Sequence, residues 1–256
     1  MTTATLPVGT GATVLAHYRY LLLEQLRIPI AVLSSATFPA LSLLFFVVPF
    51  DTGADPAASA TAVAQLCVFG VLTGFLFTFG IGVADDREKP WDPYLRTLPA
   101  PATARIAGRL LVGLTFGVVS IIPVLAVGAL FTSASAPVGT ILLGVVAVLV
   151  AGIPFLFAGL AIGYSLPTKA AVPVTQLIFL PIAFGGGLLL PPDLFPGWLQ
   201  VVSSLLPSRG ARDLVVWTVS GATPSTLAVV MFVVWTVVLG GLAVWAYRRD
   251  EGRRYR

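Results

Sequence analysis

Six long stretches of this chain contain no Asp, Glu, Lys, Arg or His. Each stretch has 21 to 24 residues, and at about 1.5 Å of rise per residue each can cross a hydrocarbon core of about 30 Å as a helix. Because lipid offers no water to satisfy free backbone groups, such runs predict membrane-spanning helices. The stretches are residues 28–50, 62–84, 110–131, 139–162, 170–190 and 227–247.

The composition excludes a sizeable soluble domain. The chain is 57% hydrophobic and only 10% charged, against about 25% charged residues in a soluble domain. Its single Cys, Cys67, lies within the second stretch, and its single His, His17, has no Cys, Asp or Glu at ligand spacing. We therefore expect one all-α integral membrane domain with no catalytic, metal or cofactor residues.

The positions of Lys and Arg predict the orientation. If both termini are cytoplasmic, 13 of the 15 basic residues lie in inner segments, and only Arg209 and Arg212 lie outside. The positive-inside rule favours this arrangement. The excess of Arg over Lys, with abundant Ala, Val and Gly, indicates a high-GC prokaryote and hence its plasma membrane. We expect a flexible N-terminus over residues 1–13, a six-span domain over 14–247 and a basic cytoplasmic tail over 248–256.

A short basic and apolar segment, residues 14–27, precedes the first span. It is too short and too charged to cross the bilayer, and its mixture of residues suits a helix that lies in the interface, here called the elbow helix. Tyr18, Arg19, Glu24 and Arg27 are its assigned functional residues. In the alternative interpretation these residues extend the first span into water, with Arg19 and Arg27 as anchors.

The longest inner loop, residues 85–109, begins with a dense run of charges and continues with aromatic and aliphatic residues. Prolines on either side favour a short helix. Large rigid side chains and Arg are enriched in interface cores, so the segment suits docking into another protein. A solvated loop that only sets topology is an equal alternative. The docking residues would be Arg87, Glu88, Lys89, Trp91, Tyr94, Leu95, Arg96 and Leu98.

The connection after the fifth span, residues 191–224, is apolar but interrupted by prolines. It is too long for a hairpin, so we expect one or two short re-entrant helices in the outer leaflet, with Arg209, Arg212 and Asp213 in water. The preceding triple glycine permits close backbone approach. An ordinary amphipathic loop is the alternative. The residues that mark this connection are Gly185, Gly186, Gly187, Pro191, Phe195 and Trp198.

This order of features resembles the permease subunits of ATP-binding-cassette exporters of the second exporter type, over roughly residues 14–247. Residues 86–99 are similar to the family's acidic and basic coupling segment, and residues 181–200 to its Pro, Phe and Gly motif that ends in Trp-Leu. The chain departs from the family pattern at residues 90–93, Pro-Trp-Asp-Pro, where the family usually has Gly-Thr.

The resemblance implies a permease subunit without its own ATPase site, and the sequence contains no G-x-x-x-x-G-K-[ST] phosphate loop. ATP and Mg would be held by a separate ABC-type ATPase subunit, which would contact the coupling residues named above. A second permease copy, identical or related, would complete the translocation path in the membrane lipid. The resemblance implies that the fifth span lines this path, so the residues that mark the connection after it, from Gly185 to Trp198, would form an outer gate. No nucleic-acid partner is expected.

The apolar spans suit a hydrophobic or amphipathic cargo, such as a drug-like molecule, lipid or glycolipid, although the same phenylalanines could simply face the bilayer. An ion-coupled secondary transporter normally has an ionisable residue in its spans, and these stretches have none. That class and a non-transporting scaffold are the alternatives. The few polar residues in the spans are candidates for the subunit interface: Gln65, Thr73, Thr78, Thr115, Ser120, Thr175 and Gln176.

Overall fold

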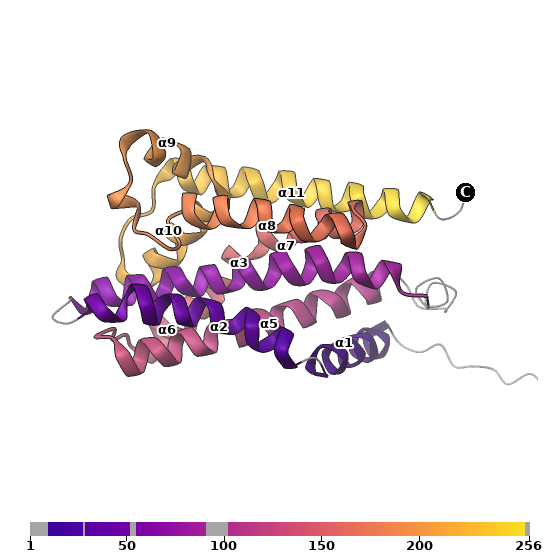
Figure 1. Ribbon diagram of the computed structural model, residues 1–256, viewed down its shortest axis with the longest axis horizontal. Helices are drawn as coiled ribbons and strands as arrows, with labels where there is room; N and C mark the ends of the chain where they lie inside the picture. The colour runs from indigo at the N-terminus through magenta and orange to yellow at the C-terminus, as the bar shows by residue number, and fades with distance from the viewer. Residues whose placement is uncertain (1–9, 28, 52–54, 91–101, 254–256) are drawn as a thin grey trace, which may run out of the picture.

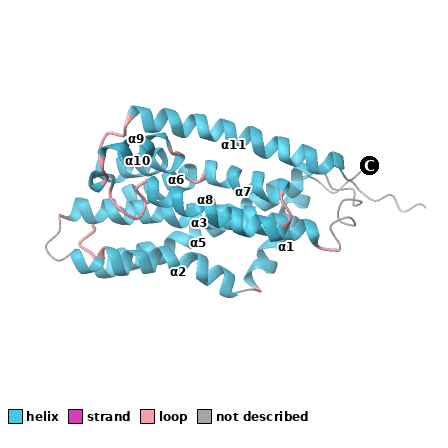
Figure 2. Cartoon of the chain, turned by 45° about the horizontal axis from the view of Figure 1, so that its top comes forward, coloured by secondary structure: helices cyan, strands magenta, loops and turns pink. Residues whose placement is uncertain are grey.

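The computed structural model describes residues 10–27, 29–51, 55–90 and 102–253, with the backbone alone at 29–36, 102, 252 and 253. All regular secondary structure in these residues is helical, as Figures 1 and 2 show. The α-helices are α1 (Thr10–Leu26), α2 (Pro29–Phe46), α3 (Pro56–Glu88), α5 (Ala102–Phe131), α6 (Val138–Ala151), α7 (Ile153–Ser165), α8 (Thr168–Gly185), α9 (Gly197–Leu205), α10 (Pro207–Ser220) and α11 (Thr226–Arg253).

Five of the expected spans are confirmed as helices of sufficient length and apolarity. They are α3, most of α5, α6 with α7, α8, and most of α11. The first expected span corresponds to α2 and a following 3-10 turn, Val48–Phe50, with side chains described only from Thr37. Several helices extend beyond the charge-free stretches, because loss of the apolar pattern marks the edge of the hydrocarbon and does not end a helix. Thus α11 continues through the first part of the expected tail to Arg253.

The fourth expected span is two helices rather than one. α6 and α7 meet at Gly152, and Pro154 at the start of α7 has no N–H with which to continue the hydrogen-bond ladder. The break lets the two halves pack on different neighbours, α6 against α10 and α7 against α3 and α11. The uninterrupted apolar pattern of residues 139–162 does not reveal this division into two helices.

α3 is the central helix of the bundle. Its most apolar window is 78% buried, whereas the other four span helices reach 17% to 44%. α7 lies closely against it because glycine replaces side chains at the contact. A Cβ at Gly159 would lie 2.8 Å from the Cβ of Phe79 and 3.0 Å from the carbonyl oxygen of Phe75. The close approach therefore fixes where α7 crosses α3.

The buried face of α3 carries phenylalanines that the sequence alone could place in a cargo path or against the bilayer. Phe75 and Phe79, each 1% exposed, pack against neighbouring helices in the core of this single chain rather than at its surface. Several polar residues expected at a subunit interface are likewise buried inside the chain. These are Gln65, Thr73, Ser120 and Thr175.

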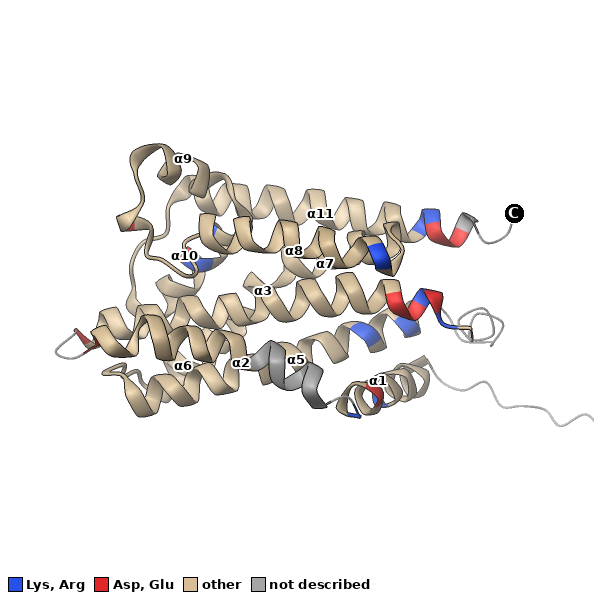
Figure 3. Ribbon diagram, in the orientation of Figure 1, with Lys and Arg blue, Asp and Glu red and all other residues tan. Residues whose placement is uncertain are grey.

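Charged residues gather at one end of the bundle, where α3 ends, α5 begins and the C-terminus lies (Figure 3). We call this the charged end. α1 lies beside the first turns of α5 at this end (Figure 1). α9 and α10 lie at the opposite end, here called the far end, and α10 packs among α3, α6, α8 and α11.

Candidate functional site

Arg87, at the end of α3, joins the ends of three helices. Its Nε and Nη2 donate to Oδ1 of Asp250 in α11 at 3.1 and 2.5 Å. Its Nη1 donates to the carbonyl oxygens of Gly163 and Leu166, at the end of α7, at 2.7 and 3.1 Å. A cation at a helix C-terminus is also favoured by the helix dipole. Since Asp250 is 5% exposed, the contact is shielded from water and holds α3, α7 and α11 together.

Lys89 forms a second polar cluster, which connects α1 and α5 to the same segment. Its Nζ donates to Glu24 of α1 and to Asp86, both at 2.7 Å. Arg109 of α5 donates to the other carboxylate oxygen of Asp86. Burial by itself would lower the pKa of Lys89, but hydrogen bonds to Asp86 and Glu24 and the charges of these groups outweigh it and raise that pKa. The lysine is therefore held as a cation between two helices.

Glu88 completes this set of contacts, because its Oε1 accepts a hydrogen bond from the backbone N of Thr168, at the start of α8, at 2.9 Å. The run of residues 85–89 thus contacts α1, α5, α7, α8 and α11, and we call it the charged hub. The three charged residues expected to dock an ATPase make contacts within this chain, and docking by them stays a prediction. The remaining docking residues lie outside the described part of the chain: Trp91, Tyr94, Leu95, Arg96 and Leu98.

The elbow residues form a helix separate from α2. α1 begins at Thr10, within the expected flexible segment, and ends at Leu26. The hydroxyl groups of Tyr18 and Thr115 are hydrogen-bonded at 3.1 Å, which attaches α1 to α5. A Cβ at Gly108 of α5 would lie 2.8 Å from the Cβ of His17, so the glycine permits this contact. Burial, followed by the charge of a nearby arginine, lowers the pKa of His17.

The other elbow residues divide between contact and exposure. Glu24 bonds Lys89, as described above, whereas Arg19 and Arg27 are exposed. Arg27 lies in a turn after α1, so the elbow is not a straight continuation of α2. Its position in the membrane interface stays a prediction.

The triple glycine ends α8 and lets the end of this helix pack directly against α10. Gly187 has φ of 75°, the left-handed conformation that favours glycine, and its N donates to the carbonyl oxygen of Phe184 at 3.0 Å. At Gly186 a Cβ would collide with Ser208 of α10, whose hydroxyl donates to the carbonyl oxygen of Ile182 at 2.6 Å. The backbones therefore meet inside one chain at this point.

The other proposed gate residues do not form one surface with the glycines. Phe195 is 9% exposed, whereas Trp198 at the start of α9 is 69% exposed. Pro191 is also exposed. The structure therefore brings the glycines and Phe195 into the packed part of the far end and leaves Trp198 at its surface. Gating by these residues stays a prediction.

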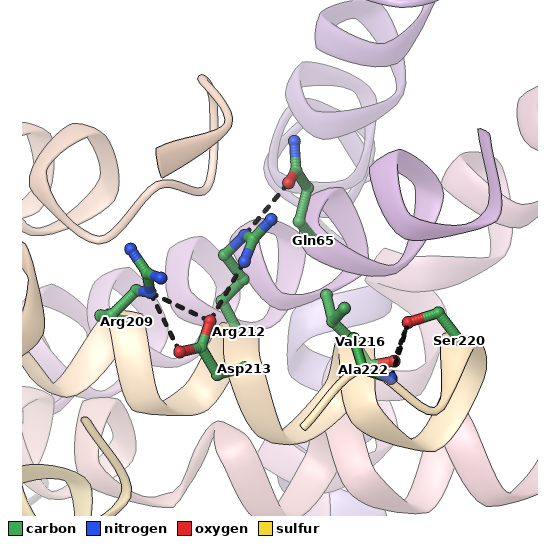
Figure 4. A network of polar contacts seen from close by, with 7 residues as sticks. All are labelled: Gln65, Arg209, Arg212, Asp213, Val216, Ser220 and Ala222. Atoms are coloured by element: carbon green, nitrogen blue, oxygen red, sulfur yellow. Dashed lines mark hydrogen bonds and ion pairs between the residues drawn. The ribbon is translucent and has the colours of Figure 1, made fainter. Parts of the chain in front are cut away.

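Arg212 and Asp213 are buried in α10, and the expectation that both stay in water is wrong. They are 9% and 6% exposed. Arg212 donates through Nη1 to Asp213 at 3.1 Å and through Nε to Oε1 of Gln65, in α3, at 3.2 Å. Arg209 donates to both carboxylate oxygens of Asp213 at 3.0 Å (Figure 4). One carboxylate thus bonds two guanidinium groups, and one of these also bonds the central helix.

Sequence reasoning misses this buried network because it places the short helices after the fifth span in the outer leaflet with their charged residues in water. The four-residue spacing of Arg209 and Asp213 could have indicated a helical ion pair. The charge-free spans had argued against a secondary transporter, but Arg212 and Asp213 show that the bundle does contain buried ionisable groups. The class of protein must therefore rest on other evidence. Among the described residues, no group of three or more His, Cys, Asp or Glu could hold a metal ion.

The fold defines a multi-pass, all-helical membrane protein whose helices meet at a charged hub. A model of the family described as ABC-2 type transporter matches residues 14–220, and the chain belongs to that family. It is also similar to the "Putative transport permease YvfS" of Bacillus subtilis (strain 168), with 24% identity over 226 residues that cover 86% of this chain and 91% of that protein. The family expected from the sequence is thereby confirmed, and it points to a transport subunit that works with an ATP-binding partner.

Proposed function

We propose that this chain is the membrane subunit of an exporter for a hydrophobic or amphipathic substrate, a drug-like molecule, lipid or glycolipid. A separate ATPase subunit, holding ATP and Mg, supplies the energy. Two permease copies, identical or related, enclose the path. Each copy crosses a prokaryotic plasma membrane six times, with α2 as its first span, and the charged end with both termini is cytoplasmic because the basic residues gather there.

The charged hub is the observation that carries this proposal. Residues 85–89 include the first three residues assigned to ATPase docking and directly precede the others, and they contact five other helices. A displacement of that segment when the ATPase subunits close would pull on all five helices at once. Polar networks with two discrete arrangements are one way in which such a displacement reaches a distant site.

Two kinds of variant separate docking of the ATPase from transmission of its movement. Leu95→Asp places a charge in the proposed docking surface, so it should abolish both ATPase copurification and export while insertion into the membrane stays normal. Asp250→Asn keeps the docking segment intact but weakens the charged bonds from Arg87. It should leave ATPase copurification unchanged and reduce export. Arg248→Gln, at an exposed position two residues before Asp250 on α11, is the matched control and should change neither.

The assay is ATP-dependent uptake of a hydrophobic fluorescent dye or a labelled lipid into inverted vesicles, with ATPase copurification measured on the same preparation. Wild-type complex yield and activity in Leu95→Asp would contradict the docking assignment. Uptake that needs an ion gradient and no ATPase would instead favour the secondary transporter. If the purified chain moves no substrate in either assay, with its ATPase present, the scaffold alternative gains support.

A further inference from the structure

An apolar groove of about 500 Å³ runs between α8 and α11. α7 forms its floor through Phe155, Ala158 and Ala161. Ile178 and Ile182 of α8 form one wall, and α11 forms the other with Trp235, Leu239, Leu242 and Trp245. Figures 1 and 2 show α8 and α11 running along the same side of the bundle. The groove is on the outside of the chain, since Leu242 and Trp245 are 46% and 53% exposed.

The two ends of the groove differ in chemistry. Towards the far end its lining includes Leu206 and Pro207, beside Trp235, whose indole Nε1 donates to the carbonyl oxygen of Leu205 at 2.8 Å. The indole presents a ring to the groove without an unsatisfied donor. Towards the charged end the lining includes Ser165 and Trp245. Arg249, one turn further along α11, stacks its guanidinium over the Trp245 ring at 5.1 Å from the centroid.

The length of the groove matches one leaflet of a bilayer. Trp235 and Trp245 are ten residues apart on α11, which is about 15 Å along a helix. The hydrocarbon core is about 30 Å thick, so the groove spans about half of it. Trp245 lies two residues before the charge-free stretch ends at Tyr247, the level at which Trp is enriched near headgroups. Arg249, four residues beyond Trp245 on the same helix, then lies at the depth of the lipid phosphates.

We propose that this groove binds one acyl chain of an anionic phospholipid from the leaflet at the charged end, and that Arg249 bonds the lipid phosphate. A guanidinium suits a phosphate through paired, charged hydrogen bonds. A second copy of the chain fits less well, because a twofold contact centred here would bring two Arg249 side chains together at the same depth. The bound lipid is a resident partner of the subunit, distinct from any transported substrate.

Brominated lipids test the site directly, because bromine quenches a nearby indole. The full chain, with Trp91, Trp198 and Trp217 replaced by Phe, keeps only the two groove tryptophans. In phosphatidylcholine nanodiscs, a small fraction of phosphatidylglycerol with a brominated chain should quench them, and unbrominated phosphatidylglycerol should reverse the quenching. Brominated phosphatidylcholine at the same fraction should quench much less.

Two sets of variants separate the acyl-chain contact from the phosphate contact. Ala161→Val and Ala161→Phe fill the groove floor in steps, so both should reduce quenching and Ala161→Phe should reduce it more. Val237→Phe, at a position 70% exposed on α11, should not reduce it. Arg249→Gln should reduce the preference for phosphatidylglycerol about fivefold, as expected for one basic residue near an anionic headgroup. Arg248→Gln, at the exposed neighbouring position, should leave it nearly unchanged.

Each contrary result overturns the proposal. Equal quenching by both brominated lipids, insensitive to the Ala161 variants, would mean ordinary bilayer contact. An equal effect of Arg248→Gln and Arg249→Gln would mean general surface attraction. Absence of quenching, together with disulfide formation between copies that carry Trp245→Cys, would mean that a second copy covers the groove. None of these measurements depends on transport, so failure of the exporter proposal leaves the test intact.

Discussion

Asp213→Asn should destabilise the chain more than Arg212→Met, although both changes break the same ion pair. Asp213 is the single carboxylate that Arg212 and Arg209 both bond. Its neutralisation leaves two neighbouring cations, and Arg212 is only 9% exposed. Removal of Arg212, in contrast, leaves Asp213 bonded to Arg209 through both oxygens at 3.0 Å.

The contacts set the expected magnitudes. Removing one partner of a buried ion pair typically costs about 3–5 kcal/mol, and this range applies to Asp213→Asn. Arg212→Met loses one hydrogen bond to a charged group and leaves Oε1 of Gln65 without this donor, so about 2 kcal/mol is expected. The double variant removes the buried cation together with its anion. It should therefore be more stable than Asp213→Asn alone, by about 1 kcal/mol or more.

The measurement is the apparent Tm of the purified chain in mild detergent. Unfolding is detected as the loss of monodisperse protein on size-exclusion chromatography after heating. Gln65→Leu is the control, because it removes one neutral acceptor and should have the smallest effect. The reasoning is refuted if Arg212→Met lowers the apparent Tm as much as Asp213→Asn, or if the double variant is less stable than both single variants.

Three other predictions concern the packing at Gly186, the orientation of the chain and the effect of pH on its stability. Gly186→Ala should lower the apparent Tm and impair export without loss of ATPase copurification, because the new Cβ collides with α10, whereas Gly197→Ala, with nothing within 4 Å, should behave as wild type. A cysteine at Ala57 should react with an impermeant thiol reagent from outside, and one at Gly252 only after permeabilisation, so external labelling of the latter would reverse the orientation. The lowered pKa of His17 means that the folded chain favours the neutral imidazole, so stability should fall as pH drops below about 6.5. His17→Gln should flatten this part of the pH profile, and an unchanged profile would show that other groups cause it.

Much of the fold could be predicted because membrane spans are a local property of the sequence. Five charge-free stretches coincide with helices long enough to cross a bilayer, and the elbow residues form their own helix. The boundaries were less predictable. The end of α8 at Gly185 came five residues earlier than the apolar pattern indicated, because the left-handed Gly187 turns the chain towards α10. The break at Gly152 could not be predicted from the apolar pattern either, because the residues on both sides of it are apolar.

The sequence identifies several residues of the candidate site, but it does not identify the residues that they contact. The sequence singled out Arg87, Glu88 and Lys89 from their charge density and from the family pattern, but it gave no sign that they bond other helices of the same chain. The sequence groups Asp250 with a basic tail, yet Asp250 accepts a hydrogen bond from Arg87, 163 residues away in the sequence. Such pairing depends on where α3 and α11 end in space, which neither segment specifies alone.

The sequence by itself determined that this chain is a multi-pass membrane protein and which stretches form helices apolar enough to cross, because transfer of a helix into lipid depends on the summed polarity of consecutive residues. Only the tertiary structure decided which polar groups are buried and what they bond. Arg212 could be placed in water or in the bundle from its local sequence, and it is buried because α10 packs against α3, where Gln65 lies 147 residues away. The cost of burying a charge depends on the partners that surround it, and those partners come from segments that meet only after the helices have packed.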